Sequence, residues 1–228
     1  TKDKMFSVIS HDVRAPVGGI KSVLDLIYED QGENKQISKQ SLDSLKNAAD
    51  QTYNLLENLL YWSRSQRGKL NHNPEWINLY DLVIENLELL QTMSDNKKIR
   101  IENKIDEDLH AVADRNMVKT VLRNLIINAI KFTYEKGTIT LDSECKNGQV
   151  EISVQDDGIG IQKHNLEKIL NNKEYYTTFG TRREKGSGLG LNLCIDFVRR
   201  NNGDLFIESE YEKGSTFTFT LPISNSES

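Results

Sequence analysis

The chain has 228 residues, 37% of them hydrophobic, and its 29 lysines and arginines against 34 aspartates and glutamates give a formal net charge of −5. This length suits one large globular domain or two small ones, and an acidic chain with dispersed basic residues has no long-range attraction for nucleic acid. No apolar run reaches the roughly 18 to 20 residues of a membrane span, and the first residues lack a signal-peptide layout. We therefore expect no nucleic-acid partner, no membrane span and no export signal in this chain.

The first 67 residues are predicted to form an all-α helical hairpin. Between Met5 and Tyr28 apolar residues recur every three or four positions, which is the spacing of one helix face, and Pro16 should kink this helix. The stripe starts at the first residues, so we expect further segments upstream. A heptad seam predicts the second helix: Leu42, Leu45, Ala49, Thr52, Leu56 and Leu59. Because one hairpin cannot cover two such stripes, we predict a homodimer that forms a four-helix bundle.

A change of pattern marks a domain boundary after the hairpin. Gly68 and Pro74 interrupt the periodicity, so residues 68–77 are predicted to be a linker. The remaining pattern predicts helices over residues 79–93, 115–132 and 189–201, and strands over 99–105, 138–143, 150–155, 205–209 and 216–221. This order predicts an α+β two-layer sandwich over residues 78–223, with a mixed sheet under one layer of helices, and a frayed tail at 224–228.

The predicted helix at 115–132 carries the first candidate site. Asn124, Asn128 and Lys131 lie on one face of this helix, away from its apolar stripe. Amide oxygens suit Mg²⁺, and amide N–H groups or an ammonium suit phosphate oxygens, so this row could hold a metal–polyphosphate. An ordinary solvated helix face has the same residues, and the motif alone leaves both interpretations open.

The second candidate lies where the strand at 150–155 ends. Asp156 is followed by Asp157, Gly158, Ile159 and Gly160. Glycines let a ligand approach the backbone, and a carboxylate at a strand end can accept a hydrogen bond from an exocyclic amine such as that of adenine. A simple surface turn also favours Asp and Gly, so this motif too has two interpretations.

The third candidate is a second glycine-rich segment, Lys185-Gly186-Ser187-Gly188-Leu189-Gly190, at the start of the helix predicted over 189–201. Free N–H groups at a helix N-terminus bind anionic phosphate. The spacing is not that of the Rossmann fingerprint, and the chain has no P-loop. Six of the fourteen glycines lie between Gly158 and Gly190, and a stretch this long is predicted to be a mobile lid.

Near the start of the chain, His11 projects away from the apolar stripe of the first helix. An exposed imidazole, with a pKa near ~6.5, is largely neutral at pH 7 and can act as a nucleophile. Asp12 could orient the ring and accept its Nδ1 proton, and Pro16 would loosen the helix one turn later. The alternative is an ordinary surface histidine.

These four segments, in this order, strongly resemble the transmitter module of sensor histidine kinases from two-component signalling. F-S-V-I-S-H-D-V-R-A-P resembles the H box of the dimerisation and histidine-phosphotransfer domain, and N-L-I-I-N-A-I-K-F-T resembles the N box. Q-D-D-G-I-G-I and K-G-S-G-L-G-L resemble the glycine boxes of the Bergerat-type ATP-binding domain, which gyrase, the Hsp90 chaperones and the mismatch-repair ATPases share. The resemblance covers nearly the whole chain.

The resemblance implies an ATP-dependent protein-histidine kinase core. His11 would be the phosphoacceptor, Asp12 the acid/base, Asn128 the Mg²⁺ ligand and Asp156 the adenine-reading carboxylate. The phosphoryl group would pass to an aspartate of a response-regulator receiver domain. The module would be the cytoplasmic portion of a membrane-anchored sensor whose upstream segments lie outside this chain. The remaining ATP contacts implied are Asn124, Lys131, Gly158, Gly160, Phe179, Lys185, Gly186, Gly188, Leu189 and Gly190.

Two positions depart from the family pattern. T-T-F-G-T-R-R around Phe179 differs from the commoner F-x-P-F of the lid, which leaves Arg182, Arg183 and Lys185 as candidates for touching phosphate. Ala15 stands four residues after His11, where kinases that also dephosphorylate their response regulator often carry Thr or Asn. We therefore expect weak regulator-phosphatase activity.

Two other functions fit parts of the sequence. The chain could be an ATPase or a serine kinase of the same superfamily, in which the first 66 residues only dimerise. The His-Asp-x-x-x-Pro context on a solvent face argues against this. The chain could also be a non-catalytic sensor scaffold, and the intact Asn128, Asp156 and glycines argue against that.

Overall fold

The computed structural model describes residues 17–25, 27–28, 38, 41–42, 45–46, 48–49, 52, 56, 72–170, 178–182, 184 and 190–223. The chain divides into two compact units, residues 1–70 and residues 71–228. Within the described ranges, no helix is long and apolar enough to cross a membrane.

The first unit contains two helical segments that lie close together. Residues 17–25 and 27–28 are helical, as are the described residues between 41 and 56. Oγ of Ser38 accepts a hydrogen bond from the backbone N–H of Ser41 at 3.0 Å, and this caps the second segment. A Cβ atom on Gly19 would lie 4.0 Å from Cβ of Ala48, so the segments meet where both residues are small. Among the described residues of this unit, the following aliphatic side chains are 45% exposed or more: Val17, Leu24, Leu42 and Leu56.

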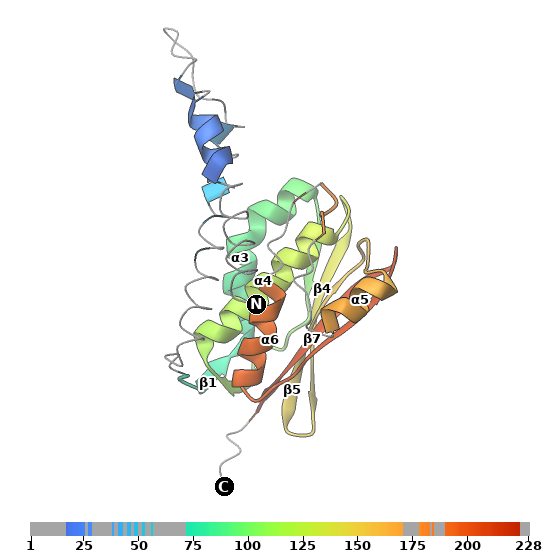
Figure 1. The fold of residues 1–228 in the computed structure, drawn as a ribbon. Coiled ribbons are helices and arrows are strands. Elements are labelled where there is room, and N and C mark those ends of the chain that lie inside the picture. Colours follow the sequence, from blue (N-terminus) through green and yellow to red (C-terminus); the bar gives the residue numbers. More distant parts are fainter. Residues whose placement is uncertain are drawn as a thin grey trace. The chain divides into compact units, whose positions relative to one another are not determined.

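The second unit is built on a five-stranded mixed sheet in the order β2-β4-β5-β7-β6 (Figure 1). Strand β2 is parallel to β4, and the other neighbours are antiparallel. Helices α3, α4 and α6 cover one face of this sheet (Figure 1), which confirms the predicted two-layer α+β sandwich. The bounds are β2 Arg100–Asn103, β4 Thr138–Lys146, β5 Gln149–Asp156, β6 Leu205–Glu210, β7 Gly214–Pro222, α3 Leu79–Lys97, α4 Arg115–Phe132 and α6 Gly190–Arg200.

The core lies between the sheet and the helices. Along β5, buried Val150, Ile152 and Val154 alternate with more exposed polar residues, because successive side chains of a strand point to opposite faces. In β7, Phe219 pairs with Ile152 and is fully buried. Helix α4 contributes a continuous apolar stripe: Met117, Val118, Val121, Leu122, Leu125, Ile126, Ala129 and Ile130.

A second, two-stranded sheet was not expected. Strand β1, Glu75–Asn78, pairs antiparallel with β3, His110–Ala113. Residues 75–77 fall within the segment 68–77 that the sequence predicted to be a linker, and this part of that expectation is wrong. A strand of four residues is too short to show a period, and Pro74 immediately precedes it. The bounds of the two domains remain a prediction.

Two helices differ from expectation. Helix α3 continues past residue 93 to Lys97, and its last turn buries Ser94 and Lys97. Because these two residues are polar, the apolar pattern of the sequence did not include them. Helix α5, Lys163–Leu170, lies within the glycine-rich stretch that was predicted to be one long lid, and it contacts β6. Its eight residues make only about two turns, which is too short for a clear apolar stripe.

Candidate functional site

The polar row of α4 lies beside the buried stripe of that helix. The helix begins at a strong N-cap, since Oδ1 of Asp114 accepts hydrogen bonds from the N–H groups of Asn116 at 3.0 Å and Met117 at 3.1 Å. Asn124, Asn128 and Lys131 are all half-buried, in contrast to the fully buried residues next to them. The row therefore lies on the side of α4 that a ligand can reach.

Asn124 lies against the start of α6. Its Nδ2 donates a hydrogen bond to the carbonyl of Thr120 at 2.8 Å, and a Cβ atom on Gly190 would lie 2.6 Å from its Oδ1. Gly190 is the first residue of α6, so the N-terminus of this helix meets the polar row of α4. The partial positive charge of a helix N-terminus favours phosphate at this place.

Asp156 is buried at the end of β5, with 3% of its surface exposed. Its Oδ1 accepts a hydrogen bond from the N–H of Gly158 at 3.0 Å. Burial raises the pKa of the Asp156 carboxyl to about 6, and the negative charge of Asp157 contributes to this increase. Hydrogen bonds from the backbone of Gly158 and Ser215 act in the opposite direction. A buried carboxyl with a raised pKa at a strand end is typical of a binding site.

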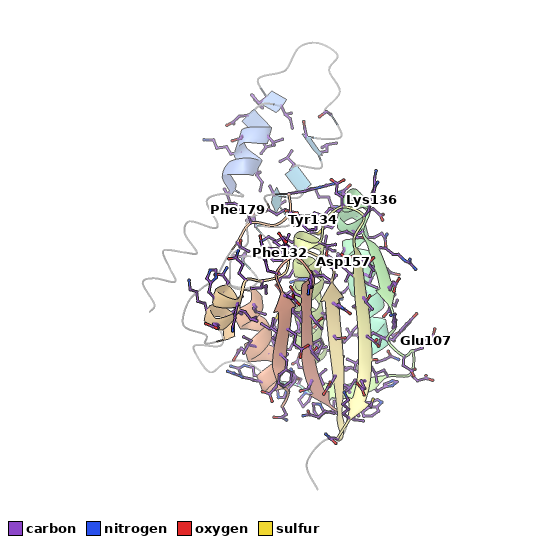
Figure 2. All side chains as sticks on the ribbon, turned by 90° about the vertical axis from the view of Figure 1, so that its right-hand side faces the viewer. Glu107, Phe132, Tyr134, Lys136, Asp157 and Phe179 are labelled. Atoms are coloured by element: carbon purple, nitrogen blue, oxygen red, sulfur yellow. The ribbon has the colours of Figure 1, made fainter. Side chains whose placement is uncertain are left out.

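The loop after Asp156 packs against the end of α4. The N–H of Ile159 donates to the carbonyl of Phe132 at 3.1 Å, and a Cβ atom on Gly158 would lie 2.2 Å from that oxygen. Gly160 has a φ of +62° and faces the backbone of Glu210. Only glycine fits these two positions. Figure 2 shows Phe132 and Asp157 at the same end of the sheet, so the two motifs meet in space.

Lys131 lies where this loop and the next segment converge. Its Nζ donates to the carbonyl of Thr178 at 3.0 Å and lies 4.6 Å from the ring centre of Phe132. Burial lowers the pKa of Lys131 to about 8; the charge of Glu184 opposes this shift and that of Lys97 adds to it. A lysine with a perturbed pKa beside Thr178 and Gly180 is suited to meet a polyanion.

The lid candidates are placed in part. Phe179 is 61% exposed, at the same end of the sheet as Phe132 (Figure 2). The guanidinium of Arg182 donates to the carbonyl of Asn96 at 2.9 Å and to the carboxylate of Glu135 at 2.6 Å. A contact of Arg182 with phosphate remains a prediction. Several residues to which the sequence analysis assigned a role lie outside the described part of the chain: His11, Asp12, Ala15, Pro16, Arg183, Lys185, Gly186, Gly188 and Leu189.

Several residues of this region were missed by the sequence reasoning. Both carboxylate oxygens of Asp157 accept from the N–H of Thr138 at 2.9 Å, which fixes the start of β4. Lys97 is buried against the C-terminus of α4. No sequence signal distinguishes a buried lysine from an exposed one at a helix end. Asp157, by contrast, lies within the motif Q-D-D-G-I-G-I, and its position there is a signal for a structural or functional role.

The described residues hold no group of three or more His, Cys, Asp and Glu side chains that could bind a metal ion. The amide oxygen of Asn128 could nevertheless serve as one ligand of a hard cation such as Mg²⁺. Mg²⁺ is commonly held by one or two protein oxygens together with substrate phosphates and water. The residues present therefore fit a magnesium ion that arrives with a polyphosphate.

Comparison with protein families divides the chain in the same way. Residues 1–68 match the His Kinase A (phospho-acceptor) domain, and residues 113–225 match the histidine kinase-, DNA gyrase B- and HSP90-like ATPase. The chain is 31% identical to the sensor histidine kinase WalK of Bacillus subtilis, over 94% of this chain and 35% of WalK. It spans less than two thirds of the length of the curated relatives it matches.

Solved structures agree with this division. The catalytic domain of the histidine kinase ThkA is 31% identical, with a TM-score of 0.57, and the match covers 66% of this chain and 96% of that domain. A structure of ThkA in complex with the response regulator protein TrrA gives a TM-score of 0.71 at 24% identity. That match covers 99% of this chain and 63% of the ThkA chain, and it supports the fold.

Proposed function

Because this chain belongs to the sensor histidine kinases of two-component signalling, we propose that it is the ATP-dependent protein-histidine kinase core of a longer signalling protein. One observation carries the proposal. The buried carboxyl of Asp156, the half-buried amide of Asn124 and the ammonium of Lys131 line the region where β5, α4 and the start of α6 converge. A carboxylate for a base, amides and an ammonium for phosphates, and a helix N-terminus are the components of a nucleotide site.

The adenine end of ATP would lie at Asp156. An ionised carboxylate accepts a hydrogen bond from the exocyclic amine of adenine, and a buried one gives that bond high selectivity, because a base without the amine leaves the carboxylate unpaired. Gly158 and Gly160 would shape this pocket, because their backbones pack directly against α4 and β6 where a side chain would clash.

The phosphates would lie along the polar row of α4. Asn124 and Lys131 would contact phosphate oxygens, with the N-terminus of α6 adding its partial positive charge. Asn128 would hold Mg²⁺, which neutralises the charge that develops on the phosphates during transfer. Gly186, Gly188, Leu189 and Lys185 complete the expected contacts, and Phe179 belongs to the segment that would cover the nucleotide.

The reaction is a transfer of the γ-phosphoryl group to His11. A nitrogen of the neutral imidazole forms a bond to the γ-phosphorus, the bond from phosphorus to the bridging oxygen breaks, and ADP leaves with that electron pair. Asp12 accepts the proton from the other ring nitrogen. In phosphoryl transfer, positioning and charge neutralisation supply most of the acceleration, so the nucleotide domain must bring ATP to His11.

The resulting phosphoramidate would pass its phosphoryl group to an aspartate of a response-regulator receiver domain. This step is supported by family membership, and ThkA has been seen in complex with a response regulator protein. The proposed use of ATP and of a receiver domain supports a cytoplasmic location for the module. The relatives are longer than this chain, and the missing length would carry the sensor.

The homodimer is supported by the first unit. The following side chains expose between 45% and 51% of their surface: Val17, Leu24, Leu42 and Leu56. Burying the exposed half is favourable by about half of the roughly 1.5 to 3 kcal/mol that full burial of such a side chain provides. A second copy of the same hairpin would cover them in a four-helix bundle.

Nucleotide binding can be tested by measuring the thermal unfolding of the second unit, residues 71–228, in the full chain. A non-hydrolysable ATP analogue with Mg²⁺ should raise the Tm of the wild type, by an amount that grows with ligand concentration. Asn128→Ala should reduce the shift, and it should reduce it less when Mg²⁺ is omitted from both samples. His11→Gln is the control and should keep the full shift. A wild type whose Tm does not respond to the analogue would favour the scaffold reading.

A further inference from the structure

The side chain of Lys97, the last residue of α3, is 5% exposed although it carries an ammonium group. Its Nζ donates hydrogen bonds to the carbonyls of Ile130 at 2.9 Å and Lys131 at 2.8 Å. These carbonyls belong to the last turn of α4, where a helix has no intrahelical donors left. Lys97 therefore caps the C-terminus of α4 from a neighbouring helix, and its positive charge suits the negative end of the helix dipole.

The same ammonium reaches a second segment, residues 178–182 and Glu184, which we call the arm. Oγ1 of Thr181 lies 2.7 Å from Nζ of Lys97, and Oε1 of Glu184 also lies 2.7 Å from it. Partial burial acts to raise the pKa of the Glu184 carboxyl. Hydrogen bonds from Lys97 and from the backbone, together with the positive charge of Lys97, act in the opposite direction and are stronger, so the pKa of Glu184 lies below its ordinary value. The carboxylate is therefore ionised, and it supplies the opposite charge that a buried ammonium requires.

The backbone of the arm rests on the end of α4. The N–H of Thr181 donates to the carbonyl of Lys131 at 3.1 Å, and the N–H of Gly180 donates to the carbonyl of Glu184 at 2.8 Å. A Cβ atom on Gly180 would lie 2.6 Å from Cγ of Lys131, so the arm approaches this lysine as closely as a chain can. Lys131 in turn donates from Nζ to the carbonyl of Thr178. Both ends of Lys131, its carbonyl and its ammonium, are thus held by the arm.

We propose that Lys97 is a positioning residue for nucleotide binding: its ion pair with Glu184 holds the arm on the end of α4, and the arm sets where Lys131 presents its ammonium to the phosphates. This inference rests on the proposed function, because it assigns Lys131 to the phosphates of ATP. It assigns Lys97 no contact with the nucleotide. If the arm moves away, Lys97 is left with carbonyl dipoles but no countercharge, so the pair couples the position of the arm to the end of α4.

A purely structural role is the alternative, in which Lys97 only caps α4. The two roles differ at Glu184. Glu184→Gln keeps the length of the side chain and leaves the carbonyls of α4 on Lys97. It removes the charge and one of the two acceptor oxygens that Lys97 and the N–H of Arg182 use. Glu144→Gln is the matched control, because it removes the same charge from an exposed ion pair outside the arm, which Glu144 makes with Lys146 at 2.6 Å.

The test uses the full chain and two measurements. Hydrogen exchange of the nucleotide-free protein should be faster in the peptide that contains Gly180 and Thr181 for Glu184→Gln and for Lys97→Met, and unchanged for Glu144→Gln. Calorimetric titration should show that Glu184→Gln weakens ATP by about tenfold, the loss of one charge-assisted contact, while the affinity for adenosine stays at the wild-type value. Lower stability alone would not change the ratio of the two affinities.

The results separate this inference from the proposed function. If the wild type binds ATP, and Glu184→Gln matches it both in the exchange of the arm and in the ratio of ATP to adenosine affinity, the positioning role is wrong and the proposed function stands. If the wild type binds no ATP, the proposed function fails and this inference fails with it. Lys97→Met is the variant most exposed to misfolding, and the conclusion therefore depends on Glu184→Gln.

Discussion

Oδ1 of Asp156 accepts a hydrogen bond from the N–H of Gly158 at 3.0 Å, in surroundings that leave 3% of Asp156 exposed. This bond lies at the point where β5 turns toward the end of α4. A carboxyl in such a place is costly to ionise, and burial raises its pKa to about 6. A hydrogen bond from the amine of adenine would offset that cost, so ligand binding and the ionisation of Asp156 favour each other.

Asp156→Asn should therefore stabilise the empty protein and weaken ATP binding. The pKa of Asp156 is about 6 in the folded chain and has the ordinary value of 3.8 in the unfolded chain, so the folded chain binds this proton more tightly. Protonation of Asp156 therefore favours folding at low pH, and this contribution is lost as the pH rises through about 6. At neutral pH the Asn variant avoids a buried charge, which is worth about 1 to 3 kcal/mol. Thermal unfolding should show a higher Tm for the catalytic unit, and titration should show ATP affinity at least about tenfold lower. A variant that is less stable than the wild type at neutral pH would contradict this account of the carboxyl.

Lys131 predicts a pH dependence of ATP binding. Its pKa is lowered to about 8 in the free protein, and neighbouring phosphates would raise it in the complex. Affinity should be full below pH 8 and should fall by up to about tenfold per pH unit above it, because the free protein must then take up a proton to bind. Lys131→Arg stays charged and should give a nearly flat profile. Equal slopes in the two proteins, measured by titration from about pH 7 to pH 9.5, would show that Lys131 is not the group responsible.

Asn86 of α3 offers a test of the core. It is fully buried, its Nδ2 donates to the carbonyl of Leu82 at 2.7 Å, and its Oδ1 has no partner among the described residues. Asn86→Leu replaces it with an apolar side chain of similar size, which should raise stability by about 1 kcal/mol because an unpaired buried oxygen is removed. The free energy of unfolding in urea measures this, with ATP affinity as the control that should not change. A loss of stability would mean that the oxygen has a partner, such as an ordered water.

The alanine at position 15 predicts a weak phosphatase activity toward the response regulator. The wild type should dephosphorylate a phosphorylated response regulator slowly, since no hydroxyl or amide stands one turn after His11 to orient a water molecule. Ala15→Thr supplies a hydroxyl and should raise the hydrolysis rate several-fold, while Ala15→Val, of nearly the same shape, should not. The release of inorganic phosphate from purified phospho-regulator measures this. Rapid hydrolysis by the wild type, with no gain in the Thr variant, would contradict the prediction.

The elements that could be predicted from sequence are those in which a regular spacing of apolar residues extends over many positions. Helix α4 has the predicted bounds, Arg115–Phe132, because its stripe is continuous and Asp114 caps it. Strands β1 and β3 have four residues each and helix α5 has eight, so none of them shows a period. Their placement depends on partners distant in sequence, and one chain read alone does not identify those partners.

The candidate site divides in a similar way. Asp156 and Gly158 could be recognised because the acidic and glycine residues stand together in one short motif. The pairing of Lys97 with Glu184 could not, because the two residues are far apart in the chain and lysine and glutamate are ordinarily exposed. Only the tertiary structure shows that Lys97 is buried and that it lies at the end of the polar row of α4.

The phosphoacceptor is the central claim, and one labelling experiment tests it directly. The wild type and His11→Gln would be incubated with γ-labelled ATP and Mg²⁺, and the protein-bound label would be exposed to acid and to alkali. The account predicts label on the wild type alone, lost in acid and stable in alkali, as a phosphoramidate requires. Acid-stable label, or equal label on His11→Gln, would contradict it and would point instead to a serine kinase or to another acceptor.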